Sequence, residues 1–501
     1  MKTVLFFLFT SLSLISCTQK TKIDIVDVTG GKISGLHSAD LHIYKGIPFA
    51  APPIGALRWK EPQELKSWEG IKECIDFSAS PIQRQPEPFA CWSEEFISPP
   101  DPLSEDCLYL NVWTEAKSSE EKRPVFVWIY GGGFNSGSAA CAIYDGESYA
   151  KKGVVFVSIN YRVGPFGFMA HHELSKEQNG ASGNYGLLDQ VAALKWVKEN
   201  IGKFGGDPGN VTIGGQSAGS MSVHALMASP LAKGLFHKAV AMSGGFGPSR
   251  IPGSLKDAEN LGMELQKLLG ANSLADLRTL KAEDIQKMSG DIKGGRMGVI
   301  TDGYLLPENA FENRINQVPV LTGWTKDDGG FLSDGALTLN QYITDTKEQL
   351  GNIAEEFLSV FAAKNDEEAM LMRTKAKTLS FAGIPAHLLG SNNSKPVYVY
   401  EVNHVPTDKP GFPHYGAFHT SDVPFALANL ETWDRPWADH DRKVEAVLSS
   451  YYLNFIKSGN PNGENLPQWY PYSSDNQSIQ VINEETFNTT NRYKAEFSVW
   501  N

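Results

Sequence analysis

The segment Gly215-Gln216-Ser217-Ala218-Gly219 constrains the fold of this chain more than any other feature. It follows an apolar run at 211–213 and precedes a stretch of good helix formers without proline at 217–228. A strand that enters a helix through a Gly-x-Ser-x-Gly turn holds the serine in a strained backbone conformation, and small flanking residues let the turn close. The serine hydroxyl then projects above a sheet edge at the positive end of a helix, so Ser217 is a candidate nucleophile.

A second motif fits a nucleophile at position 217. Residues 125–129 form a short apolar run rich in β-branched and aromatic side chains, which predicts a buried strand. Three successive glycines follow at 131–133 and leave their backbone N–H groups open to a ligand. With the N–H of Ala218, those of Gly132 and Gly133 are predicted to form an oxyanion hole.

Buried strands alternate with amphipathic helices along the chain. Alternation of this kind predicts the α/β class, with a large central, mostly parallel, twisted sheet covered by helices on both faces. Together with the serine turn, this pattern predicts the α/β-hydrolase fold. The region 340–389 reads as mainly helical, and we expect it to cap the site. The predicted strands lie at 125–129, 154–159, 211–213, 239–242, 318–322 and 397–400.

In this fold an acid follows a later strand and a histidine follows the last one, after the serine in the chain. The predicted strand at 318–322 precedes two adjacent acids, Asp327 and Asp328. Of the eleven histidines in the chain, four follow the predicted strand at 397–400, and spacing alone leaves all four open as the base: His404, His414, His419 and His440.

These motifs together resemble the type-B carboxylesterases, the family that also holds the cholinesterases and bile-salt lipases. The segment 204–219 reproduces the serine signature of that family, and 105–113 is similar to its second signature, with Glu115 as a departure shortly after it. Further similar blocks lie at 46–58, 160–162, 183–190 and 459–472, so the resemblance extends across the mature chain.

The resemblance implies particular partners for Ser217. The family histidine stands in a Gly-Ala-x-His context followed three residues later by an acid, which identifies His419 and Asp422. The family acid precedes a glycine, which identifies Asp328, with Asp327 as the rival. The family usually has Glu at that position. We therefore expect a triad of Ser217, Asp328 and His419, with Asp422 and Ser243 beside it.

The activity that the resemblance implies is that of a serine carboxylic-ester hydrolase without cofactor or metal. The net charge of −12 disfavours nucleic acid and polyanionic substrates. As a member of such a family the protein is expected to act on small to medium neutral esters, and we expect it to be a monomer. A lipase or a glycan-deacylating esterase is an alternative. A different class is a catalytically silent adhesion or ligand-binding surface lipoprotein of the same fold.

Seven aromatic side chains near the motifs are open to two interpretations, a substrate pocket or the core. For any single one we favour the core. They are Trp92, Phe96, Trp113, Phe134, Phe168, Phe331 and Phe418.

The N-terminus has the features of an export signal. Lys2 supplies a positive charge, residues 4–15 are apolar but too short to span a bilayer, and Leu14-Ile15-Ser16 precedes Cys17. This pattern predicts a lipoprotein signal peptide at 1–16, a lipidated Cys17 in a tether at 17–24, and one catalytic domain at 25–501. An ordinary secretory signal is the alternative. The protein is then exported and anchored to a bacterial membrane, periplasmic or at the cell surface.

Four cysteines remain beyond Cys17. The family joins the equivalent of Cys107 to an upstream cysteine, and because none occurs around 80–83, the resemblance implies Cys91 as its substitute. We expect a Cys91–Cys107 disulfide, with Cys74 and Cys141 as buried thiols.

Overall fold

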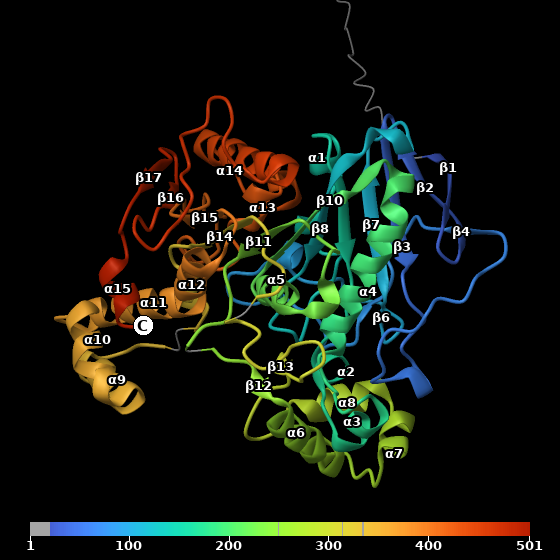
Figure 1. Ribbon diagram of the computed structural model, residues 1–501. Coiled ribbons are helices and arrows are strands. Elements are labelled where there is room, and N and C mark those ends of the chain that lie inside the picture. The colour runs from blue at the N-terminus through green and yellow to red at the C-terminus, as the bar shows by residue number, and fades with distance from the viewer. Residues whose placement is uncertain (1–20, 249, 313, 333–334, 501) are drawn as a thin grey trace, which may run out of the picture.

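One large mixed sheet runs through the computed structural model, which describes residues 21–500 except 249, 313, 333 and 334 (Figure 1). The predicted signal peptide at 1–16 and the lipidation site Cys17 lie outside the described residues. Within the described part, no helix has both the length and the apolar character needed to cross a membrane.

Thirteen strands form this sheet within the described residues. Their order is β1-β2-β3-β7-β9-β8-β10-β11-β14-β15-β16-β17, with β4 paired to β2. The bounds are β1 (Thr21–Val28), β2 (Gly31–Ser38), β3 (Leu41–Pro48), β4 (Ile71–Glu73), β7 (Tyr109–Thr114), β8 (Arg123–Ile129), β9 (Val155–Ile159), β10 (Gly206–Gln216), β11 (Lys238–Met242), β14 (Val320–Thr325), β15 (Val397–Val402), β16 (Ile479–Ile482) and β17 (Phe487–Thr489). Two small separate pairs join β5 (Ser80–Pro81) to β6 (Leu103–Ser104) and β12 (Gly253–Ser254) to β13 (Ile300–Thr301).

The centre of the sheet is parallel. All neighbours from β9 through β8, β10, β11, β14 and β15 to β16 pair in parallel, whereas the pairs of β1 with β2, β2 with β3, β3 with β7, β7 with β9 and β16 with β17 are antiparallel. The six predicted strands are confirmed as β8, β9, β10, β11, β14 and β15. β14 begins at Val320, two residues later than predicted, and Pro319 before it has no N–H to donate to a ladder.

Helices pack on this central part of the sheet, in agreement with the predicted α/β-hydrolase fold. Helices α4 and α5 contact β10, and α14 contacts both β8 and β10. The helices are α1 (Glu147–Ala150), α2 (Gly164–Phe168), α3 (His172–Glu177), α4 (Tyr185–Asn200), α5 (Ala218–Ala228), α6 (Leu255–Leu268), α7 (Leu274–Thr279), α8 (Ala282–Ser289), α9 (Leu339–Leu350), α10 (Ala354–Val360), α11 (Asp366–Thr378), α12 (Ile384–Asn392), α13 (Val423–Ala426), α14 (Asp439–Ser458) and α15 (Lys494–Ser498).

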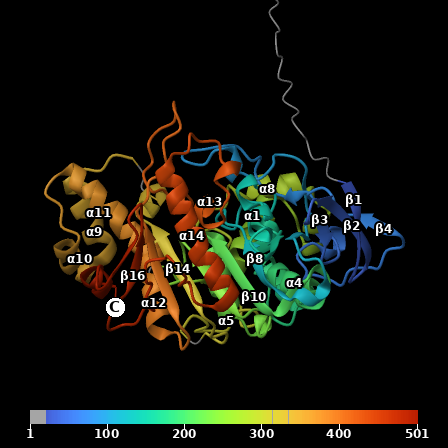
Figure 2. The ribbon, with the colours of Figure 1, turned by 90° about the horizontal axis from the view of Figure 1, so that it is seen from above.

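The region 340–389 is helical, as predicted. It comprises α9, α10 and α11, a π-helical turn η9 (Leu379–Gly383) and most of α12. Figures 1 and 2 place α9, α10 and α11 at one end of the molecule, outward of β14. Helix α11 packs on the short helix η7 (Asp328–Leu332), and α12 packs on β15. These helices therefore support the ends of the two strands that carry the predicted acid and base.

Candidate active site

The turn at Ser217 has the strained geometry that its sequence predicts. Strand β10 ends at Gln216, helix α5 begins at Ala218, and Ser217 between them has φ 59° and ψ −121°, outside the usual regions for a non-glycine residue. A Cβ on Gly219 would lie 2.1 Å from the carbonyl oxygen of Ile129, so no side chain fits there. The N–H of Ser217 donates to the Met242 carbonyl at 2.9 Å, which ties the turn to β11.

His419 and Asp328 meet at the ends of neighbouring strands. Asp328 follows β14, His419 lies in the loop after β15, and both side chains are buried. The Nδ1 atom of His419 forms a hydrogen bond with Oδ1 of Asp328, and the other oxygen, Oδ2, accepts the N–H of Thr325 at 3.3 Å. The acid therefore fixes the orientation of the imidazole through Nδ1, and Nε2, which the Gln216 amide contacts, is the nitrogen left for proton transfer.

The rival histidines contact other acids. His404 lies 2.8 Å from Asp441, and His440 lies 3.6 Å from the same carboxylate. His414 is exposed and pairs with Asp408 at 2.9 Å. Of the four histidines that spacing left open, His419 is the one that shares a pocket with Ser217.

Asp327, the rival acid, forms hydrogen bonds with the backbone of Ala417 and not with the imidazole. Its Oδ2 accepts the N–H of Ala417 at 2.8 Å, and its own N–H donates to the Ala417 carbonyl at 3.0 Å. The two adjacent acids thus have different roles. Asp327 fixes the backbone two residues before His419, and Asp328 fixes the imidazole ring of His419. The family resemblance alone did not predict this contact of Asp327.

The glycine loop after β8 offers backbone donors to the same pocket. Gly132 and Gly133 have φ of 107° and 62°, and a Cβ on Gly132 would lie 2.2 Å from the Ser136 carbonyl oxygen. Ala218 is the first residue of α5, where an N–H has no partner within the helix. In the described residues these three N–H groups have no acceptor outside regular secondary structure. They are free to bind an anion.

Gln216 is a contact that the sequence analysis missed. Its Nε2 lies 3.1 Å from Nε2 of His419 and 3.3 Å from Nδ1. No hydrogen bond joins Ser217 Oγ to His419 in the described part of the chain, although both line one pocket. In unliganded enzymes such bonds are often long and tighten when substrate binds. The middle position of Gly-x-Ser directly precedes the nucleophile, and this signal could have identified Gln216.

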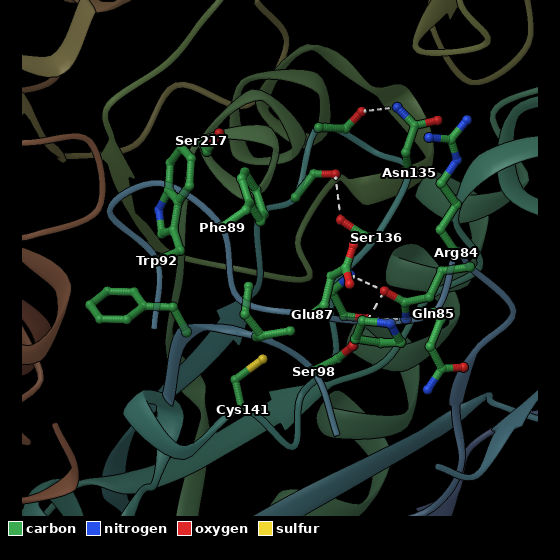
Figure 3. Close-up of a pocket in the computed structure, with 18 of the residues that line it drawn as sticks. Arg84, Gln85, Glu87, Phe89, Trp92, Ser98, Asn135, Ser136, Cys141 and Ser217 are labelled. Atoms are coloured by element: carbon green, nitrogen blue, oxygen red, sulfur yellow. Dashed lines mark hydrogen bonds between the residues drawn. The ribbon is translucent and has the colours of Figure 1, made fainter. Parts of the chain in front are cut away.

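The pocket around Ser217 has a volume of about 830 Å³ (Figure 3). Its walls come mainly from residues 83–98, from the glycine loop and from residues 286–297. The region 340–389 contributes no residue to this lining, so it does not cap the site as predicted. Its nearest approach is Phe381, whose ring centroid lies 5.5 Å from that of His419. The helices of the region pack on η7 and β15 instead.

Aromatic side chains surround His419 inside the pocket. The ring of Phe331 stacks on the imidazole at 4.3 Å between centroids, and the indole of Trp92 meets it edge-on at 6.3 Å. The indole N–H of Trp92 donates to Thr420 Oγ1 at 3.1 Å. Of the seven predicted aromatics, Trp92, Phe96 and Phe331 line the pocket, whereas Trp113, Phe134, Phe168 and Phe418 are buried outside its lining.

Asp422 lies buried close to the acid of the triad, and Ser243 is buried as well. Burial first, and the Asp328 carboxylate second, raise the pKa of Asp422 from 3.8 to about 7. Its Oδ2 accepts a hydrogen bond from the Tyr400 hydroxyl at 3.2 Å, and its Oδ1 has no partner among the described residues. The hydroxyl of Ser243, at the end of β11, is likewise unpartnered there.

The predicted Cys91–Cys107 disulfide is wrong. The four cysteines in the described residues, Cys74, Cys91, Cys107 and Cys141, are free thiols, and Cys74 and Cys141 are buried, as predicted. Cys107 lies fully buried beside Arg162, whereas Cys91 lies in a turn closed by Phe89 and Trp92 and is partly exposed. The two sulfur atoms therefore belong to different environments.

One group of possible metal ligands occurs among the described residues, made of His404, His440 and Asp441. It lies outside the lining of the pocket. Asp441 also accepts hydrogen bonds from the N–H of Ala438 and from Thr407, at the start of α14. These contacts give the group a structural use as a helix cap.

Fold and site together define a class of protein, the serine carboxylic-ester hydrolases of the α/β-hydrolase fold. The chain belongs to the carboxylesterase family, whose model matches residues 22–500. It is 35% identical to the fumonisin B1 esterase of Sphingopyxis macrogoltabida, over 88% of this chain and 83% of that protein. It is 34% identical to the para-nitrobenzyl esterase of Bacillus subtilis, over 92% and 95%. A solved PNB esterase superimposes with a TM-score of 0.83 at 31% identity, covering 95% of this chain and 99% of that one.

The environment of Asp422 leads to a prediction about stability and pH. Because its pKa is raised in the folded state, the unfolded chain binds fewer protons between pH 4 and about pH 7. The contribution of this carboxyl group to stability is therefore present at low pH and is lost as the pH rises toward 7. Asp422→Asn removes that loss. The free energy of unfolding of the variant minus that of the wild type should therefore be about 2–3 kcal/mol more positive at pH 8 than at pH 5.

Urea unfolding of both proteins at the two pH values measures this difference. The exposed Asp345 offers a matched control, since Asp345→Asn should shift stability equally at both. An Asp422→Asn effect that is the same at pH 5 and pH 8 contradicts the prediction.

Proposed function

We propose that the enzyme hydrolyses small to medium carboxylic esters through an acyl-enzyme on Ser217. One observation carries this proposal: the imidazole of His419, hydrogen-bonded to Asp328 through Nδ1, faces the pocket that also contains Ser217 and the glycine loop. A nucleophile, an oriented base and free backbone donors are the groups that acyl transfer requires.

In the first half-reaction Ser217 Oγ attacks the ester carbonyl carbon while Nε2 of His419 takes the hydroxyl proton. The carbonyl oxygen becomes an oxyanion and is held by the N–H groups of Gly132, Gly133 and Ala218. His419 then gives its proton to the departing alcohol, and the acyl group stays on the serine.

In the second half-reaction water takes the place of the alcohol. His419 removes a proton from the water as it attacks the acyl-enzyme, and returns that proton to Ser217 Oγ as the acid leaves. Asp328 stabilises the imidazolium that forms in both steps and keeps Nδ1 as the donor. The chain supplies the nucleophile, the base and the oxyanion donors of this cycle, and solvent supplies the water.

The pocket supports substrates of moderate size. Its volume of about 830 Å³ lies within the range of small-molecule sites. Trp92 and Phe331 offer apolar surface beside His419, which suits an acyl or alcohol group with few polar atoms. A lipase or a glycan-deacylating esterase would use the same chemistry on other substrates.

The serine is the most direct test of the chemistry. Ser217→Ala should lower kcat/KM for p-nitrophenyl butyrate by about 10³-fold or more, because the members of a triad act as a unit. A fluorophosphonate probe should label the wild type and not the variant. Labelling that persists in Ser217→Ala, or a wild type that neither reacts nor hydrolyses, contradicts the proposal and favours the silent adhesion alternative.

The same assay, run with p-nitrophenyl esters from acetate to palmitate, distinguishes between the substrate alternatives. Highest activity at short and medium chains is expected. A maximum at palmitate would favour the lipase.

The two adjacent acids allow a matched comparison. Asp328→Asn should lower kcat by about 100-fold or more, since an amide cannot stabilise the imidazolium. Asp327→Asn keeps an oxygen that can accept the Ala417 N–H, so its loss should stay within about tenfold. Steady-state kinetics on p-nitrophenyl butyrate measure both. A larger loss for Asp327→Asn than for Asp328→Asn assigns the acid to Asp327.

We also propose that the enzyme is a membrane-anchored lipoprotein. The support is the sequence of the first 17 residues: Lys2, the apolar stretch at 4–15 and the small residues before Cys17. Expressed in a Gram-negative host, the wild type should stay with membranes after detergent-free lysis, because several acyl chains anchor stably. Cys17→Ser should release it to the soluble fraction. Wild-type enzyme found only in the soluble fraction would falsify the anchor.

A further inference from the structure

Three exposed arginines lie in or near the pocket and form what we call the arginine cluster: Arg84, Arg250 and Arg296. Arg250 lies outside the pocket lining. Arg84 and Arg296 line the pocket together with Ser217. Nη2 of Arg296 lies beside the glycine loop, 3.9 Å from the position of a Cβ added to Gly133. Figure 3 shows Arg84 on the same side of the pocket as Asn135, which follows that loop.

Arg250 is related to His419 through the ring of Phe381. Its guanidinium carbon lies 4.8 Å above the ring centroid of Phe381, and that ring is the one whose centroid lies 5.5 Å from His419. The segment that carries Arg250 follows β11 and passes near α5, since Nη1 also contacts Met221 Sδ at 3.9 Å. The cluster therefore extends from the glycine loop to the neighbourhood of the base.

No acid neutralises the arginine cluster. Among the described residues none of the three arginines forms an ion pair, whereas Arg58, Arg162 and Arg278 pair with Glu105, Asp189 and Glu177. Burial first, and the nearby Arg296 second, lower the pKa of Arg250, so these two guanidinium groups repel each other. Among the described residues that line the pocket, Glu87 alone carries a carboxylate, and no ion pair joins it there to an arginine.

This positive charge is opposite in sign to the net charge of the whole protein. The chain carries 57 acidic and 45 basic residues, so partners for arginine are abundant. All three side chains are exposed, so water screens their mutual repulsion, and their attraction for an anion is strongest where the pocket excludes water. The planar guanidinium group is suited to carboxylates, which it binds through two parallel hydrogen bonds.

We propose that the substrate is an ester that carries a free carboxylate near the scissile bond, and that the arginine cluster binds this carboxylate. The inference rests on the proposed ester hydrolysis and specifies its substrate class. It revises the expectation of neutral esters, which the net charge supported. The net charge describes the whole molecule, whereas Arg84 and Arg296 bring positive charge to the wall of the pocket.

Two pairs of esters test the proposal and distinguish where the carboxylate stands. With 4-acetoxybenzoate and its methyl ester, the charge lies on the alcohol part. With monomethyl and dimethyl adipate, it lies on the acyl part. The measured quantity is the ratio of kcat/KM for the charged ester to kcat/KM for its neutral partner. In the double variant Arg250→Gln/Arg296→Gln this ratio should fall at least about tenfold for at least one pair, because hydrogen bonds to a charged group are lost.

Two further variants serve as controls. Arg250→Lys/Arg296→Lys keeps the charge and should retain more of the ratio than the glutamine variant. Arg442→Gln removes an arginine that pairs with Glu431 and lies outside the pocket lining, and it should leave the ratio unchanged.

A ratio that is the same in the wild type and the glutamine variant for both pairs overturns the proposal while ester hydrolysis stands. If no ester is hydrolysed and the fluorophosphonate probe does not label Ser217, the proposed function itself is overturned, and the carboxylate proposal with it. The two failures are therefore distinguishable.

Discussion

The hydrogen bond between Asp328 and Nδ1 of His419 is the interaction on which the rest of the site depends. It joins the loops that follow two adjacent parallel strands, β14 and β15, whose register places both side chains at the same sheet edge. Asp327 adds a backbone clamp at Ala417, so the histidine is held at the ring and at the main chain. The strained turn of Ser217 and the glycine loop have chemical value only because this imidazole is oriented toward their pocket.

Local sequence patterns predicted the features that depend on neighbouring residues alone, namely the central strands and the serine turn. The central strands are apolar runs, and the serine turn needs glycines that leave no room for a Cβ, so both could be read from short segments. His419 and Asp328 required the family resemblance, because spacing left four histidines and two acids open. The contacts that were missed, those of Gln216, Asp327 and Arg296, join residues at least 90 positions apart. The disulfide failed for the same reason: proximity in sequence did not decide which environment each cysteine occupies.

Electrostatics in this enzyme differ between the whole molecule and the site. The chain is acidic overall, and an acidic surface repels anions at long range. Inside the pocket, Arg84 and Arg296 outnumber the single acid Glu87, and Arg250 adds a third positive charge behind Phe381. Salt screens the distant charges more than it weakens a direct contact. Selectivity for a carboxylate-bearing ester can therefore coexist with a negative net charge.

The central claim is that Ser217, His419 and three backbone amides converge on one reacting carbonyl group. A crystal structure of the enzyme with a phosphonate bound covalently to Ser217 tests it most directly. The account predicts the phosphoryl oxygen about 2.7–3.1 Å from the nitrogens of Gly132, Gly133 and Ala218, with Nε2 of His419 within hydrogen-bonding distance of Ser217 Oγ. An adduct whose phosphoryl oxygen points away from the glycine loop, or whose serine oxygen stays out of reach of His419, contradicts the account.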